Sequence, residues 1–514
     1  MAFTTETRAL SGAAGLAIFA NAAQAQTLDD TINGLFASST GWFVNFIFAP
    51  FPGTSFPWIV AWLVIAATIF TLYFGFIQFR VIRHSIQLVK GDYSDPNDAG
   101  EVSHFQALAT ALSGTVGLGN IAGVAVAVGI GGPGATFWMI LAGLLGMASK
   151  FTECTLGVKY RNEYPDGTVS GGPMYYMTKG FAERGMPGGK VLAVLFAIFC
   201  ILGSFGGGNM FQANQAHQQL AGILGDYPGW ITGVIFAAIV FAVIVGGIKS
   251  IAQVTEKIVP FMGILYVGSA LIIILMNIHN VGWAFGQIFA GAFTSTGIAG
   301  GAVGALIQGF KRAAFSNEAG VGSAAIAHSA VRTKEPITEG FVSLLEPFID
   351  TVVICTMTAL VIIFTQQLVI DPETGMYLLN DNGTIQTVTG ATGVGLTSAA
   401  FAAAFSWFPY VLGLAVILFA FSTMISWSYY GLKAWTYLFG EGKTQELSFK
   451  LLFCFFVIIG AAASLGPVID FSDAAIFAMA VVNIIGLYVL MPIVKAEVQS
   501  YLGRLASGEI RKFK

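Results

Sequence analysis

Residues 113–123 read SGTVGLGNIAG, inside an apolar segment, 104–131, that is long enough to cross a bilayer. Glycine at this density weakens a continuous helix. The stretch therefore predicts an unwound membrane helix, with close packing through small residues as the alternative. Unwinding frees backbone amides and carbonyls, which a membrane protein tolerates only where they line a cavity or find partners.

A second glycine-rich stretch, 297–304, lies in the apolar segment 283–310. These segments begin two five-span halves, 104–278 and 283–494, which enter the membrane from opposite sides. Interrupted helices at corresponding positions of two inverted halves indicate a midplane binding site in a secondary transporter. We therefore expect an all-α multi-span membrane protein with a 5+5 inverted repeat, preceded by one extra helix at 57–80.

Composition supports a membrane protein. Of 514 residues, 55% are hydrophobic and 10% are charged, against about 25% charged residues in soluble domains. The net charge of -3 and the lack of a dense basic run give no sign of a nucleic-acid partner. The cysteines all fall in apolar segments without CxxC spacing, so we expect neither redox chemistry nor a metal site.

Eleven apolar segments are long enough to be spans. They are centred within 57–79, 104–131, 133–158, 191–214, 229–248, 258–278, 283–310, 340–366, 401–432, 449–467 and 473–494. Lys and Arg follow the odd-numbered spans, for example Arg80, Lys159 and Lys495, whereas the other connections, including 367–399, hold none. Because basic loops stay in the cytoplasm, the bias predicts an external N-terminus and a cytoplasmic tail at 495–514 in a bacterial-type cell membrane.

The N-terminus resembles a targeting segment. Residues 1–26 combine Arg8, a short apolar stretch and a small-residue end at 23–25, which predicts a secretory signal peptide, with a retained tail as the alternative. Residues 27–56 mix aromatic residues with Gly and Pro, and we expect an external, interfacial segment there.

Five separated motifs resemble those of the alanine or glycine:cation symporter family, which is also called the sodium:alanine symporter family. The motifs are ATAL (109–112) leading into VGLGNIAGVA (116–125), GGPGA (131–135) with FWM (137–139), GNM (208–210) with QAN (212–214), FSNEAG (315–320), and FST (421–423) with WSYYG (427–431). The resemblance covers about residues 60–495 and implies a LeuT-like fold. Ile140 departs from the family pattern, which commonly has Trp there.

The resemblance also implies the site. Amides of Leu118 and Gly119 would receive a substrate carboxylate, and the other expected substrate contacts are Gly114, Phe205, Asn209, Thr423, Ser426 and Trp427. Sodium would be held by oxygens of Ser113, Val116, Phe419, Ser422 and Thr423, a set suited to a hard cation. Simple helix contacts are the alternative for Asn209, and anchoring at the membrane interface is the alternative for Trp427.

Several ionisable residues lie near or inside the predicted spans, and their roles have more than one interpretation. Glu346 and Asp350, four residues apart, are predicted to form a proton relay, a gate or interior hydrogen bonds. Glu318 lies near Lys311 and Arg312, and we expect an ion pair or an inner-gate element. Asp470 and Asp473 are expected in a solvated external turn. The five histidines map to span ends or loops, so beyond sodium no metal site is expected.

The predicted function is inward symport of a small neutral amino acid, alanine or glycine, with sodium as the co-transported ion. Proton coupling, or another substrate such as serine or glutamine, is the alternative within transporters. An intramembrane enzyme is disfavoured because HExxH and GxSxG motifs are missing from the sequence, and a channel because no filter loop repeats. The expected partners are the amino acid, sodium and the bilayer, with no obligatory protein partner.

Overall fold

The structure, a computed structural model, describes residues 34, 38–165, 167–293 and 301–513. The predicted signal peptide, 1–26, lies outside these residues. A helix covers 38–47. The helices that follow are α2 (Trp58–Tyr73), α3 (Ile77–Arg80), α4 (Ile82–Val89), α5 (His104–Thr115), η1 (Gly119–Gly123), α6 (Val124–Gly131), α7 (Gly134–Lys159), α8 (Pro173–Glu183), α9 (Gly189–Phe205), η2 (Gly206–Met210), α10 (Phe211–Leu224), α11 (Gly229–Ile244) and α12 (Gly247–Met276).

The second half of the chain is helical too. Its elements are η3 (Ile278–Asn280), α13 (Val281–Phe293), α14 (Gly301–Asn317), α15 (Ser323–His328), α16 (Pro336–Ser343), α17 (Leu345–Pro347), η4 (Phe348–Cys355), α18 (Thr356–Phe364), α19 (Val394–Ala404), α20 (Phe408–Phe439), α21 (Lys443–Ala462) and α22 (Leu465–Ala506). A small hairpin pairs β1 (Asn162–Glu163) antiparallel with β2 (Val169–Ser170).

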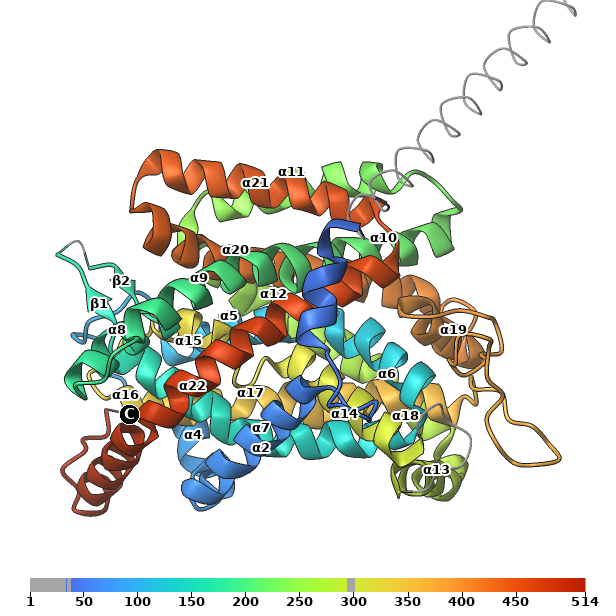
Figure 1. Cartoon of the computed structure of the whole chain (residues 1–514), viewed down its shortest axis with the longest axis horizontal. Helices are drawn as coiled ribbons and strands as arrows, with labels where there is room; N and C mark the ends of the chain where they lie inside the picture. The colour runs from blue at the N-terminus through green and yellow to red at the C-terminus, as the bar shows by residue number, and fades with distance from the viewer. Residues whose placement is uncertain (1–33, 35–37, 166, 294–300, 514) are drawn as a thin grey trace, which may run out of the picture.

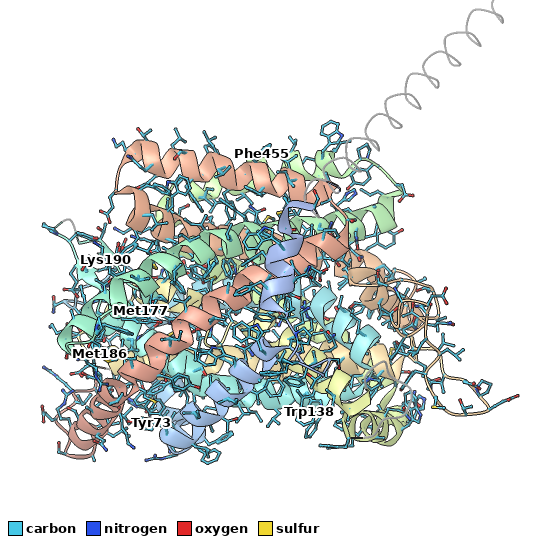
Figure 2. The ribbon with its side chains drawn as sticks, in the orientation of Figure 1. Tyr73, Trp138, Met177, Met186, Lys190 and Phe455 are labelled. Carbon is cyan, nitrogen blue, oxygen red and sulfur yellow. The ribbon has the colours of Figure 1, made fainter. Side chains whose placement is uncertain are left out.

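Seven of the described helices are long and apolar enough to cross a membrane, and the bent pair formed by α5 and Gly119–Gly131 makes eight. The helices α2, α11 and α19 are apolar but shorter. The predicted count of eleven spans and the inverted repeat therefore stay predictions. Large apolar side chains such as Phe455, which is 56% exposed, lie on the outer edge of the bundle, where lipid would cover them (Figure 2).

The predicted interruption of the second span is confirmed. The helix α5 starts with a capping box, in which Ser103 and Gln106 satisfy each other's backbone N–H groups. It ends at Thr115, and the chain resumes as the π-helix η1 at Gly119 after a bend of 49°. A break of three residues thus separates two half-helices inside an apolar segment.

The seventh predicted span differs from expectation. Residues 297–300 of the predicted glycine-rich break, 297–304, lie outside the described residues, and residues 301–304 begin the helix α14. The described chain is interrupted elsewhere, between α14 and α15, where Glu318, Gly320 and Gly322 all have positive φ. A left-handed Glu318 is sterically unfavourable, so the surrounding side chains must hold it there.

The last two predicted spans also begin and end differently. The turn between α21 and α22 lies at residues 463–464, so Asp473 sits inside α22 and is fully buried. The predicted turn at Asp470 and Asp473 is therefore wrong, because both lie inside α22, and of the two only Asp470 is exposed as expected. Most of the predicted tail, 495–514, continues α22 up to Ala506.

Basic connections gather at one end of the molecule, which we call the basic face. Salt bridges there join Asp98 to Lys334, Glu335 to Arg504 and Asp92 to Lys512. Arg161 donates to the carbonyls of Ala99, Ser329, Val331 and Thr333. In Figure 1, α8, α16 and the C-terminus lie at this end, with α13 and α19 at the opposite end.

Candidate functional site

The broken helix α5–η1 lies against α10 and α20 in the interior. The amide of Gly117 donates to Oδ1 of Asn120 at 2.8 Å, and the amide of Leu118 donates to Oε1 of Gln212 at 3.0 Å. Nε2 of Gln212 donates to the carbonyl of Gly207 at 2.8 Å. The unwound backbone therefore presents N–H groups to acceptor oxygens, which is the arrangement a carboxylate could replace.

Buried oxygen atoms cluster between α5 and α20. The Thr423 hydroxyl donates to the carbonyl of Ser113 at 2.9 Å, and the Ser113 hydroxyl donates to the carbonyl of Ser422 at 2.7 Å. The Ser422 hydroxyl lies 3.1 Å from the carbonyl of Phe419. Four of the five predicted sodium ligands thus meet, and Val116, the C-cap residue of α5, follows Ser113 by three positions. An all-oxygen, buried donor set fits a hard cation such as sodium.

The remaining contacts of α20 reach both interrupted segments. Ser426 donates to the carbonyl of Thr110 at 3.0 Å, which ties α20 to α5. Trp427 Nε1 donates to Oε1 of Glu318 at 2.9 Å, which ties α20 to the break between α14 and α15. Trp427 is 1% exposed, so the alternative of an interfacial anchor is wrong.

Glycines allow this close approach. A Cβ on Gly208 would lie 2.2 Å from Cγ of Trp427, and one on Gly117 would lie 2.4 Å from the Thr423 hydroxyl. A Cβ on Gly114 would lie 2.8 Å from the Tyr430 hydroxyl, and one on Gly119 would touch Phe315 at 3.4 Å. Backbone and aromatic faces therefore meet directly around the break.

Phe205 and Asn209 face a different neighbour from the other predicted substrate residues. Phe205 stacks on Phe456 of α21 with ring centroids 4.4 Å apart. The Asn209 side chain donates to the carbonyl of Phe453, also in α21, at 2.7 Å. Oδ1 of Asn209 is buried and has no hydrogen-bond partner among the described residues. Substrate contact by this pair stays a prediction.

The expected ion pair of Glu318 with Lys311 and Arg312 is wrong. Glu318 contacts the hydroxyl of Ser323 and the indole of Trp427. Lys311 and Arg312 lie within α14 and both pair with the buried Asp473 of α22. The salt bridge joins α14 to α22 and does not involve Glu318. Glu318 instead makes its contacts at the interruption between α14 and α15.

Glu346 and Asp350 belong to separate networks because the chain between them leaves regular α-helix for the π-helix η4. Asp350 accepts hydrogen bonds from Asn120 at 2.6 Å and from Ser316 at 2.9 Å, which joins both interrupted segments. Glu346 lies 3.3 Å from Lys150 and contacts His328. Asp350 therefore matches the prediction of interior hydrogen bonds. A role in a proton relay stays a prediction for Glu346 alone.

Two histidines lie at helix ends, as predicted, but are not solvated. His104 is the first residue of α5 and His328 the last of α15, and both are buried and contact Glu339, which the sequence analysis did not select. Ligand atoms of Cys154, His328 and Glu346 lie within 4.8 Å of one another. The ammonium group of Lys150 lies 3.3 Å from the same Glu346, and this positive charge opposes a divalent cation there.

Several residues around the site escape selection from the sequence. Gln212 and Phe315 stand in recognised motifs, yet nothing in their spacing shows that they touch the break. Lys150 did carry a usable signal, because a lysine inside a predicted span is a functional hypothesis by default. His328 and Glu339 carried no such signal, since neither lies inside a predicted span.

Comparison with known proteins shows which family the chain matches. A profile of the sodium:alanine symporter family matches residues 39–514. The chain is 40% identical to the sodium/alanine symporter AgcS of Methanococcus maripaludis, over 89% of this chain and 95% of that protein. It is 32% identical to the probable sodium/glutamine symporter GlnT of Bacillus subtilis, over 86% of this chain and 87% of that protein.

The structure is similar to that of MhsT in complex with L-phenylalanine, with a TM-score of 0.51 at 15% identity. The similarity covers 75% of this chain and 89% of MhsT. At this identity the likeness concerns the fold alone, which is that of the LeuT-type transporters. Family members are transporters rather than enzymes, and the apolar helices of this chain are consistent with a multi-pass membrane protein. This chain belongs to the sodium:alanine symporter family.

Proposed function

We propose that the protein is a sodium-coupled symporter that imports a small neutral amino acid, alanine or glycine, by alternating access. The observation that carries the proposal is the meeting of an unwound helix with a buried oxygen cluster. Backbone N–H groups of the unwound segment, which now donate to side-chain oxygens, suit a carboxylate, and carbonyl and hydroxyl oxygens suit sodium. Binding of both ligands at one place makes their coupling direct.

The substrate carboxylate would take the N–H groups of Leu118 and Gly119, in competition with Gln212. Trp427 would limit the substrate side chain, because it packs tightly on Gly208 and Gly203. A small aliphatic side chain fits such a contact better than a glutamine side chain does. Gly114, Phe205, Asn209, Thr423 and Ser426 complete the proposed contacts.

Sodium, as co-transported cargo, would bind the oxygens of Ser113, Val116, Phe419, Ser422 and Thr423. Two present hydrogen bonds, from Thr423 to Ser113 and from Ser422 to Phe419, would yield to the ion. The cost of breaking them is modest, since a typical net hydrogen bond contributes about 1 kcal/mol.

The basic face is proposed to be cytoplasmic, in a cell membrane of bacterial type. The clustering of basic connections at one end supports this orientation, because such loops translocate poorly. The N-terminus would then be external, with a signal peptide at 1–26, and the chain would end in the cytoplasm.

The test is uptake of radiolabelled alanine into proteoliposomes, with sodium outside compared with potassium outside at matched pH. Accumulation that requires the inward sodium gradient is expected. Uptake that follows a proton gradient instead would favour proton coupling. Competition with unlabelled glycine, serine, glutamine and D-alanine ranks the substrates, and strong competition by glutamine alone would contradict the size limit at Trp427.

A further inference from the structure

Six buried ionisable side chains form a continuous chain from the basic face toward the centre. All are at most 2% exposed, and they come from α5, α16, α15, α17 and α7: His104, Glu339, His328, Glu346, Lys150 and Glu153. We call this set the acid–histidine chain. The sodium cluster and the unwound backbone do not use any of its members.

Hydrogen bonds link the acid–histidine chain from His104 to Glu346, and ion pairs continue it to Lys150 and Glu153. Glu339 contacts Nδ1 of His104 through Oε2, and its Oε1 lies 2.5 Å from Nδ1 of His328. Nε2 of His328 contacts Oε1 of Glu346. Oε2 of Glu346 lies 3.3 Å from the Lys150 ammonium, which lies 3.9 Å from Glu153.

The contacts of His328 require an extra proton. A neutral imidazole carries one N–H and one lone pair, yet both ring nitrogens of His328 face carboxylate oxygens. A lone pair facing a carboxylate is repulsive, so one more proton must lie on one of these links. An imidazolium places it between two negative charges, where it also reduces the excess of three buried carboxylates over one ammonium.

Neighbouring groups do not supply a substitute charge. The other titratable side chains near His328 and its partners are Cys154, Tyr176, Glu318 and Tyr430. None of these is cationic. Arg161 is cationic, but its guanidinium is engaged by four carbonyls at 329–333 and 99 and by Glu163. Lys150 lies beyond Glu346, on the far side from His328.

The chain has an entry at the basic face. His104 lines a cavity of about 630 Å³ there, together with Lys90, Ser103, Arg332 and Phe513. Water in this cavity can therefore exchange protons with the first imidazole of the chain. The contact between His104 and Glu339 joins α5 to α16. Any inward opening that separates these two helices therefore breaks this contact.

We propose that His328 is a proton-binding site loaded from the cytoplasm, and that the bound proton holds the inner face closed. A proton from cavity water would bind Nε2 of His104, while Nδ1 of that ring releases its proton to Oε2 of Glu339. Rotation of the Glu339 carboxyl would present that proton to Nδ1 of His328, which already carries a hydrogen on Nε2. One proton enters, one imidazolium forms, and His104 remains neutral.

The first test reads the proton directly and does not depend on transport. The protein has five histidines, so ¹⁵N-histidine labelling in lipid nanodiscs gives a small set of ring signals. At about pH 7.5, where an unperturbed histidine is mostly neutral, one imidazolium is expected. It should vanish in His328→Gln and persist in His217→Gln, whose ring lies off the chain against Thr232.

His104→Gln provides a second variant at the cavity rim, in case His328→Gln fails to fold. It should keep the imidazolium signal but slow its exchange with bulk protons. Five neutral histidines in the unmodified protein would overturn the proposal, and so would an imidazolium whose exchange is unchanged in His104→Gln.

The second test rests on the proposed function and measures regulation. Sodium-driven alanine uptake is compared at internal pH of about 6 and about 8, with external pH fixed, a range in which histidine titrates. Uptake several-fold slower at acid internal pH is expected in the unmodified protein and in His217→Gln, but not in His328→Gln. Sodium-driven uptake indifferent to internal pH would overturn the regulatory role alone. Absence of sodium-driven uptake would refute the proposed function, and the ring signals would still decide the proton site.

Discussion

At the scale of single residues, side chains rather than glycine alone keep the first interrupted helix open. Asn120 and Gln212 take the freed amides of Gly117 and Leu118, and Thr423 covers the carbonyl of Ser113. These contacts occupy the groups that a carboxylate and a cation would use. The arrangement described here is thus a closed one in which protein oxygens and donors satisfy one another.

Thr423→Val tests the oxygen cluster, because it removes the hydroxyl but keeps the branched shape. The carbonyl of Ser113 loses its donor and the proposed ion shell loses a ligand. We expect the sodium concentration for half-maximal uptake to rise about tenfold, since a buried unpaired polar group costs about 1–3 kcal/mol.

The matched control for Thr423→Val is Ser428→Ala in the same helix. The Ser428 hydroxyl bonds only locally, to the carbonyl of Ile425, and should leave sodium dependence unchanged. Equal sodium dependence in Thr423→Val and the unmodified protein would remove Thr423 from the ion site.

Gly208→Ala tests the contact between η2 and Trp427. The new Cβ would lie 2.2 Å from Cγ of Trp427, and the indole cannot retreat without losing its bond to Glu318. Overpacking of this kind costs about 1–3 kcal/mol, so we expect a lower Tm and strongly reduced uptake. Gly222→Ala in α10, where a Cβ meets open space, should change neither, and a tolerated Gly208→Ala would show that Trp427 is free to move.

At the scale of elements, the two interruptions differ in how far the sequence predicts them. The break after α5 follows from local glycine density, so it can be predicted. The break after α14 depends on Glu318 adopting a positive φ, which Trp427 and Ser323 stabilise by hydrogen bonds. Because Trp427 lies 109 residues from Glu318 in the chain, no local sequence pattern predicts this hydrogen bond.

Asp473→Asn tests the salt bridge between α14 and α22. Loss of the carboxylate charge leaves Lys311 and the buried Arg312 without their anionic partner. Breaking a buried ion pair costs about 3–5 kcal/mol, so we expect a marked fall in thermal stability in detergent. Asp381→Asn is the control, because Asp381 is exposed and forms no salt bridge within the described part of the chain, and equal stability of both variants would contradict the pairing.

At the scale of the whole molecule, composition and charge bias predict a membrane protein, the interrupted helices predict a transporter, and family membership confirms the transporter class. The sequence could not predict the acid–histidine chain, because its members are brought together only by packing of α5, α7, α15 and α16. Hydropathy likewise misplaces Lys311 and Arg312 in a connection, although both lie within α14. Pairing of polar side chains that are far apart in the sequence cannot be predicted from local hydrophobic periodicity.

Orientation is tested by cysteine labelling in intact cells. Thr389→Cys, in the exposed part of the 365–393 connection, should react with a membrane-impermeant maleimide added outside. Ser507→Cys, exposed after α22, should react only after permeabilisation. Three of the four native cysteines are buried, and the unmodified chain gives the background. The reverse pattern would place the basic face outside and contradict the proposed topology.

Arg161 has a consequence for biogenesis. It follows α7 directly, in the first half of the chain, yet three of its carbonyl acceptors, on Ser329, Val331 and Thr333, are synthesised about 170 residues later. A ribosome that has released only the first half leaves that guanidinium without these acceptors. The inner surface of the early chain thus remains incomplete during insertion, and the two halves mature together rather than one after the other.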